Sequence, residues 1–70
     1  MMIRKGFDIE VECARIAAKK GAMDSMARHL SAAHALALYA DPMLLPLYGK
    51  ADAECWQEYE QCKTTTRVAA

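Results

Sequence analysis

Three cysteines and two histidines are the side chains of this sequence that could ligate a metal: Cys13, His29, His34, Cys55 and Cys62. Structural zinc sites pair two cysteines that have two to four residues between them with two histidines that have three to five residues between them. His29 and His34 approach this spacing without a cysteine pair, and five residues place them about 140° apart around a helix. The pattern therefore predicts no metal centre and no cofactor. Buried thiols acting as small apolar side chains are the better interpretation.

A catalytic thiol is the other chemistry to consider. Cys13 and His34 could meet if their segments pack as two helices of a hairpin. A cysteine nucleophile also needs an orienting group and an oxyanion site, which are usually held in a cleft. A chain of 70 residues offers little cleft. We therefore expect no catalytic residue and no enzyme.

Charge and hydropathy exclude further classes of protein. Nine basic and nine acidic side chains give a formal net charge of zero, which disfavours non-specific nucleic-acid binding because that binding neutralises phosphates. No apolar run approaches the roughly 20 residues of a membrane-spanning helix, and no signal peptide is recognisable. We expect a cytoplasmic protein with reduced thiols.

Residues 23–40 form the strongest predicted helix. Asp24 lies where an N-cap or a first-turn acid is expected, and Asp41-Pro42 ends the helix because proline disfavours helical geometry in the residue before it. One side is apolar. Leu36 and Tyr39 lie on the other side, where a surface helix normally carries charge. A helix that is apolar on both sides must be covered on both sides, which favours a homodimer. The apolar side comprises Met23, Met26, Ala27, Leu30, His34, Ala37 and Leu38.

Residues 8–20 are predicted as the first helix, with Asp8 as N-cap and Gly21 just beyond its end. Phe7 precedes it and should fold back as an apolar anchor. The main apolar stripe comprises Ile9, Cys13, Ile16 and Ala17; a weaker one comprises Val11, Ala14 and Ala18. A competing interpretation reads the alternation over residues 7–13 as a strand. That would suggest a ribbon-helix-helix DNA-binding dimer, although its outward residues would be acids.

Residues 51–63 are predicted as a third, amphipathic helix, followed by a frayed tail at residues 64–70. The stripe of this helix comprises Ala51, Cys55, Tyr59 and Cys62, with Trp56 at its edge. Residues 41–50 contain two prolines and a glycine, which predicts an irregular connector. This connector carries the apolar side chains Met43, Leu44, Leu45, Leu47 and Tyr48. They could plug the end of the hairpin or form a protruding patch.

Two partial resemblances bear on the fold. The spacing of small and apolar residues from Ala14 to Ala33 resembles one tetratricopeptide-type helical hairpin, although no second repeat follows, so it supports hairpin geometry only. Residues 26–40 loosely resemble a helix-turn-helix with Ser31 at the turn position. Its second helix would span residues 32–40, and it contains no Arg, Lys, Asn or Gln to read base edges.

These observations predict an all-α, three-helix domain over residues 1–63, with an N-terminal antiparallel αα-hairpin, a third amphipathic helix and a dimeric state. The expected function is a non-enzymatic protein–protein interaction module. It would act as an inhibitor or adaptor of another protein, such as those that phages and mobile elements encode. The alternative is a helix-turn-helix or ribbon-helix-helix DNA-binding regulator. The predicted partner-binding residues are Leu36, Tyr39, Met43, Leu44, Leu45, Leu47, Tyr48 and Trp56.

Overall fold

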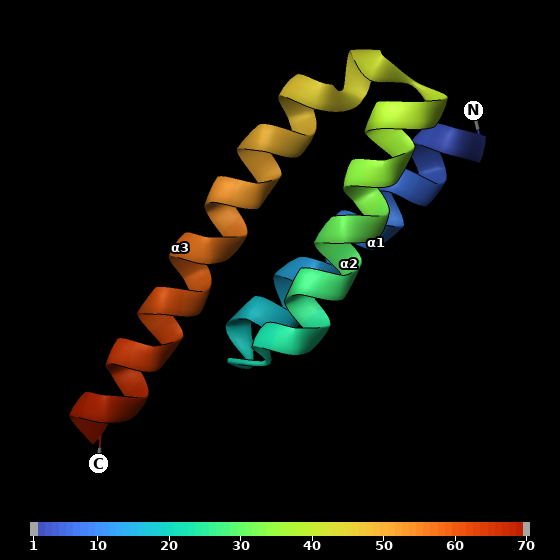
Figure 1. Cartoon of the computed structure of the whole chain (residues 1–70). Helices are drawn as coiled ribbons and strands as arrows, with labels where there is room; N and C mark the ends of the chain where they lie inside the picture. Colours follow the sequence, from blue (N-terminus) through green and yellow to red (C-terminus); the bar gives the residue numbers. More distant parts are fainter. Residues whose placement is uncertain (1, 70) are drawn as a thin grey trace.

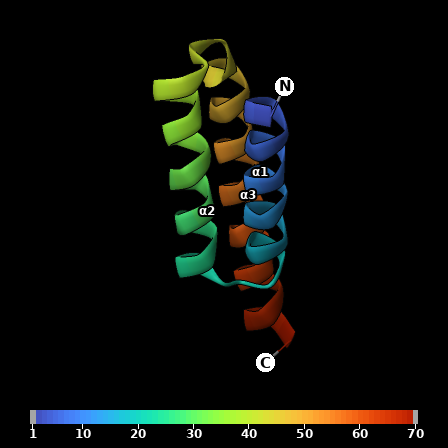
Figure 2. The ribbon, with the colours of Figure 1, turned by 90° about the vertical axis from the view of Figure 1, so that its right-hand side faces the viewer.

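The computed structural model describes residues 2–69, with the side chains of residues 2–64. It consists of α1 (Met2–Lys19), α2 (Met23–Ala35), a π-helical turn η1 (Leu36–Ala40), a 3₁₀ turn η2 (Pro42–Leu44) and α3 (Leu45–Ala69). α1 and α2 form an antiparallel hairpin, and α3 runs back along it and projects beyond the α1–α2 turn (Figures 1 and 2). The molecule measures 44 × 17 × 15 Å. The predicted all-α class, with three helices and an N-terminal hairpin, is confirmed.

The turn between α1 and α2 depends on Gly21, which has a φ of +72°. The amide of Gly21 donates to the carbonyl of Ala18 at 3.1 Å, and the amide of Ala22 donates to the carbonyl of Ala17 at 2.9 Å. This pair of bonds is the Schellman arrangement, which satisfies carbonyls left free at a helix end. The predicted position of Gly21 just beyond the first helix is therefore confirmed.

The predicted start of the first helix is wrong. α1 begins at Met2 and not at Asp8, because the Asp8 carboxylate accepts a hydrogen bond from Arg4 Nε at 3.1 Å, one helical turn earlier, instead of capping a helix. Phe7 is buried inside this longer helix, so it packs in the core without folding back. Residues 7–13 are helical, and no strand occurs among residues 2–69 to form a DNA-reading ribbon.

The second helical run ends at Ala40, as the Asp41-Pro42 pair predicts. Its last turn widens into the π-helical η1, where the amide of Asp41 donates to the carbonyl of Leu36 at 2.9 Å. The chain stays helical through Ser31, so the turn of a helix-turn-helix is absent there. Asp24 lies in the first turn and does not cap α2, which follows Ala22.

The irregular connector predicted for residues 41–50 is much shorter in the structure. Only Asp41 is extended, and its side chain accepts a hydrogen bond from the amide of Met43 at 3.2 Å, which caps η2. α3 then begins at Leu45, because Pro46 lies in the first helical turn, where its missing N–H is not needed. α3 also continues past Lys63 to Ala69, where a frayed tail was predicted; residue 70 lies outside the described part of the chain.

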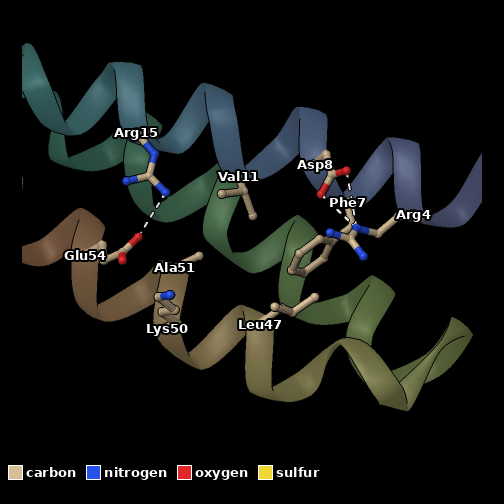
Figure 3. Close-up of a pocket in the computed structure, with 9 residues that line it drawn as sticks. All are labelled: Arg4, Phe7, Asp8, Val11, Arg15, Leu47, Lys50, Ala51 and Glu54. Carbon is tan, nitrogen blue, oxygen red and sulfur yellow. Dashed lines mark hydrogen bonds and ion pairs between the residues drawn. The ribbon is translucent and has the colours of Figure 1, made fainter.

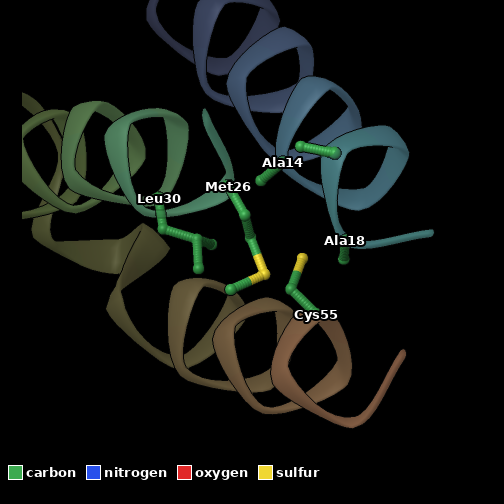
Figure 4. Packing of buried hydrophobic residues seen from close by; sticks show 6 residues of the cluster. Ala14, Ala18, Met26, Leu30 and Cys55 are labelled. Carbon is green, nitrogen blue, oxygen red and sulfur yellow. The ribbon is translucent and has the colours of Figure 1, made fainter. Parts of the chain in front are cut away.

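The core consists of two adjoining clusters. In the first, Met26 of α2 and Cys55 of α3 meet the alanines of α1 (Figure 4). In the second, Phe7 and Leu44 pack against alanines of α2 and η1, and Tyr48 contacts both clusters. Six of the eleven buried residues are alanines, so the helices lie close together around few large side chains. The buried residues are Phe7, Ala14, Ala17, Ala18, Met26, Leu30, Ala33, Ala37, Leu44, Ala51 and Cys55.

The stripe of α1 that faces the core is the one that appears weaker in the sequence. Ala14 and Ala18 are fully buried, whereas Ile9 and Ile16 of the expected main stripe are exposed. α1 packs against both α2 and α3, and small side chains let both helices approach closely. The stripe predicted for the third helix is confirmed: Ala51 and Cys55 are buried, and Tyr59 and Cys62 are half-buried.

Three methionines, Met23 and Met26 of α2 and Met43 of η2, provide a test of this core. Met26 has no exposed surface, so Met26→Ala should lower the free energy of unfolding by about 2–5 kcal/mol through lost burial and a residual cavity. Met23→Ala and Met43→Ala, at exposed positions, should change it by less than about 0.5 kcal/mol. Urea unfolding followed by circular dichroism measures all three. Equal effects at positions 26 and 43 would contradict the assigned core.

Replacing each of two glycines by alanine should change the free energy of unfolding in opposite directions. Gly21→Ala should lower stability by about 1 kcal/mol, because its φ of +72° is strained for an L-residue and the added Cβ would lie 3.3 Å from Cys62 Sγ. Gly49 lies within α3, and a Cβ there meets nothing within 4 Å. Gly49→Ala should therefore raise stability by about 0.5–1 kcal/mol through helix propensity. Urea unfolding followed by circular dichroism measures both changes in stability. An increase in stability in Gly21→Ala would contradict the turn geometry.

Candidate functional site

Both histidines are engaged in contacts between helices. The ring of His34 stacks on Tyr48 of α3, with centroids 4.4 Å apart and planes 8° from parallel. His29 Nδ1 lies 2.7 Å from Glu10 Oε1 of α1. No hydrogen bond joins His34 to Cys13 in the described structure, and over residues 2–69 no three metal-ligating side chains converge. His34 thus joins α2 to α3 by stacking, and His29 joins α2 to α1 by a polar contact.

The three thiols lie in different environments. Cys55 is fully buried, and Cys13 and Cys62 are half-exposed. Burial raises the pKa of the Cys55 thiol, against the opposing effect of the nearby Arg15 charge. A thiol with a raised pKa is a poorer nucleophile at neutral pH because less of it is ionised. Cys55 is therefore a structural side chain.

A groove of about 180 Å³ runs between α1 and α3 (Figure 3). Its charged side chains largely neutralise one another: Arg4 pairs with Asp8 on α1, and Arg15 reaches Glu54 across the groove. The groove thus has the character of a helix–helix contact and offers few unpaired groups to a ligand. It is lined by Arg4, Phe7, Asp8, Val11, Arg15, Leu47, Lys50, Ala51 and Glu54.

Arg15 is the polar link between α1 and α3. Its Nη2 donates to Glu54 Oε1 at 3.1 Å and its Nη1 donates to Glu58 Oε2 at 3.3 Å. The hydrogen bond to Glu54 raises the pKa of Arg15, desolvation lowers it, and the bond to Glu58 raises it further. Because two acids one turn apart share one guanidinium, this contact sets how α3 is positioned along α1.

One end of the molecule gathers exposed apolar side chains from three elements. Tyr39 of η1 and Met43 of η2 are 86% and 84% exposed, and Met2 and Ile3 begin α1 at the same end (Figure 1). We call these four residues the apolar end.

The packing beneath the apolar end places its parts side by side. Phe7 of α1 and Leu44 of η2 share a core cluster. A Cβ on Gly6 would lie 3.7 Å from Leu36 Cδ1. The start of α1 is therefore level with η1 and η2, so Met2 and Ile3 lie at the same end of the molecule as Tyr39 and Met43.

The remaining predicted partner-binding residues occupy other positions. Leu44 is only 3% exposed, so it belongs to the core and is not available to a partner. Leu36, Leu45 and Tyr48 are half-buried against the second core cluster and support the apolar end from beneath. Leu47 lines the groove.

Trp56 lies farther along α3, edge-to-face on Tyr59 with ring centroids 5.7 Å apart. It is therefore separate from the apolar end. The sequence does not point to Met2 and Ile3, because the first helix that it predicts begins at Asp8 and leaves both residues outside it. Two large apolar residues so close to an acid–base pair at a spacing of four, Arg4 and Asp8, could have indicated an earlier helix start.

The π-helical turn contributes to how Tyr39 is presented. A π turn adds one residue to the helical turn, which shifts the direction of the side chains that follow, and such turns occur frequently at functional sites. Here η1 contains Tyr39 and leads directly into Asp41, whose carboxylate fixes η2 and Met43. The two most exposed large apolar side chains outside α1, among the residues whose side chains are described, thus lie on a short, hydrogen-bonded corner.

Comparison with protein families, with curated proteins and with solved structures finds no match to this chain. No helix within the described residues is long and apolar enough to cross a membrane. The case for a function therefore depends on the distribution of exposed side chains alone.

The buried thiol provides a prediction. Cys13 and Cys62 should react with a thiol reagent in the native protein, whereas Cys55 should react only at the rate of unfolding. Since its pKa is raised in the folded state, its contribution to stability is complete below the unfolded thiol pKa of about 8.5. That contribution should be lost as pH rises above this value. Reagent kinetics with Cys55→Ala as control, and unfolding at pH 7 and pH 10, measure both effects. Rapid native labelling of all three thiols would contradict the burial.

Proposed function

We propose that this chain is a non-enzymatic protein-binding module that docks its apolar end into an apolar pocket of another protein, as an inhibitor or adaptor. The observation that carries the proposal is the joint exposure of Tyr39 and Met43 on a hydrogen-bonded corner, at the same end of the molecule as Met2 and Ile3. Tyrosine and methionine are enriched at protein interfaces, where a few such anchors provide most of the binding energy.

The balance of buried and exposed side chains supports binding. Among the large apolar side chains of residues 2–64, only Phe7, Met26, Leu30 and Leu44 are buried, whereas ten are exposed. Removing apolar surface from water stabilises a complex by about 25 cal/mol per Å². Contiguous exposed apolar groups, unlike scattered single ones, mark interaction sites. The apolar end gathers four such side chains from three elements at one end of the molecule.

The fixed backbone of the apolar end also favours binding there. The backbone of Met43 is held by its hydrogen bond to Asp41, and Leu44 anchors the next residue in the core. Binding therefore costs little ordering of the corner itself. Because the molecule is elongated, end-on docking covers a small area, which suits insertion into a pocket better than contact with a flat surface. A module docked in this way could block the pocket, as an inhibitor, or present its remaining length, as an adaptor.

The test compares the pair of exposed residues at the apolar end with one exposed residue at the opposite end of α2. The variant Tyr39→Ser/Met43→Ser removes both anchors, and Met23→Ser removes an equally unbranched apolar side chain at the start of α2. Tagged wild type and variants are used to capture proteins from nuclease-treated host lysate. We expect wild type and Met23→Ser to retain the same protein, and the double variant to lose it at least tenfold.

Circular dichroism should show unchanged helix content in both variants, because all three side chains are exposed. Retention of the captured protein by the double variant would contradict docking through the apolar end. If capture requires intact nucleic acid, or if wild type retains no protein, the proposed function is wrong.

A further inference from the structure

A second apolar surface lies along the outer side of α1. Met2, Ile9 and Ile16 recur every seven residues, and their exposed fractions are 87%, 53% and 45%. Residues at this spacing share one side of a helix. At about 100° per residue, this side is roughly opposite Ala14 and Ala18, which face the core. We call these three residues the outer stripe.

The charges beside the outer stripe have a particular order. Lys5, Glu12 and Lys19 also recur every seven residues and follow one flank of it. Lys5 and Glu12 lie about 10 Å apart along the helix, too far to pair with each other. Neither has an ion-pair partner among the described side chains, where Arg4 pairs with Asp8 instead. This flank therefore presents unpaired charges of alternating sign.

Only some arrangements of two α1 helices bury the outer stripe and also bring opposite charges together. In a parallel pair, this flank of one helix would meet the opposite flank of the other. Gly6 and Cys13 on that flank carry no charge, and Glu10 already lies 2.7 Å from His29 Nδ1, so Lys5 and Glu12 would gain no matched pairs.

In an antiparallel pair, residues on the same flank of the two helices meet. With Ile9 on the two-fold axis, Met2 of one copy faces Ile16 of the other, and Lys5 of one copy lies beside Glu12 of the other, twice by symmetry. Shifting the axis toward Glu12 would bring the two Glu12 side chains together.

We propose that the outer stripe binds a second copy of this chain, with the two α1 helices antiparallel and Ile9 at the two-fold axis. The apolar contacts provide the affinity, and the alternating charges select direction and register. Met2 belongs to both the outer stripe and the apolar end, whereas Tyr39 and Met43 remain free in this dimer. The dimer would carry two apolar ends and is a different interaction from the proposed function.

A charge exchange tests the register. Lys5→Glu places acids against acids across the interface, and Glu12→Lys places bases against bases. Each single variant should raise the dimer dissociation constant by roughly tenfold or more, since two pairs are lost and replaced by repulsion. The double variant Lys5→Glu/Glu12→Lys re-creates both pairs with reversed sign and should restore the dissociation constant to within about threefold. Sedimentation equilibrium of the full chain measures each value.

Two further variants test the apolar part. Ile9→Lys places two like charges on the axis and should leave only the 7.8 kDa monomer. Met23→Lys, at a position of similar exposure on α2, should leave the dimer intact. Helix content by circular dichroism should match that of wild type in both, because both side chains are exposed.

Each alternative outcome overturns a stated part of the proposal. A wild-type chain that is monomeric up to its solubility limit would overturn the dimer. Dissociation by Tyr39→Ser/Met43→Ser but not by Ile9→Lys would move the interface to the apolar end. Failure of the double charge variant to recover would overturn the antiparallel register. Since Ile9→Lys should still capture the partner protein, this test and that of the proposed function can fail separately.

Discussion

Close packing of alanines is the constraint from which the rest of this structure follows. Ala14 and Ala18 of α1 and Ala33 of α2 have no exposed surface, and helices meeting at such small residues lie close together. Little volume then remains between them, and few large side chains, chiefly Met26 and Phe7, fill it. A core of this kind buries little apolar area per residue, so α3 must contribute to it along most of the hairpin.

The same constraint explains why so many large apolar residues are exposed. Side chains such as Ile9 and Ile16 would hold the helices apart if they faced inward, so the alanines occupy the core and the isoleucines face outward. Tyr39 and Met43 are exposed for a different reason, because the chain must reverse direction at η1 and η2. The molecule therefore has two apolar surfaces, one along a helix and one at a corner, and we propose a different partner for each.

The sequence by itself determined the all-helical class, the hairpin and its turn, and the end of the second helical run. These follow from local chemistry: Gly21 tolerates a positive φ, and proline at position 42 excludes helical geometry in the residue before it. The stripe of the third helix was also readable, because Glu54 and Glu58 bordered its apolar positions clearly. Tyr39 and Met43 were recognised as candidates from their unusual positions, one on the back of a helix and one in a connector.

The tertiary structure decided which of two apolar stripes of α1 is buried, because that choice depends on packing against two helices at once. It also decided where α1 and α3 begin. Asp8 could equally cap a helix or pair with Arg4, and Pro46 could end a connector or occupy a first turn; local sequence does not distinguish these possibilities. Finally, burial separated Leu44 from its neighbour Met43, since only the path of the corner determines which side chain points inward.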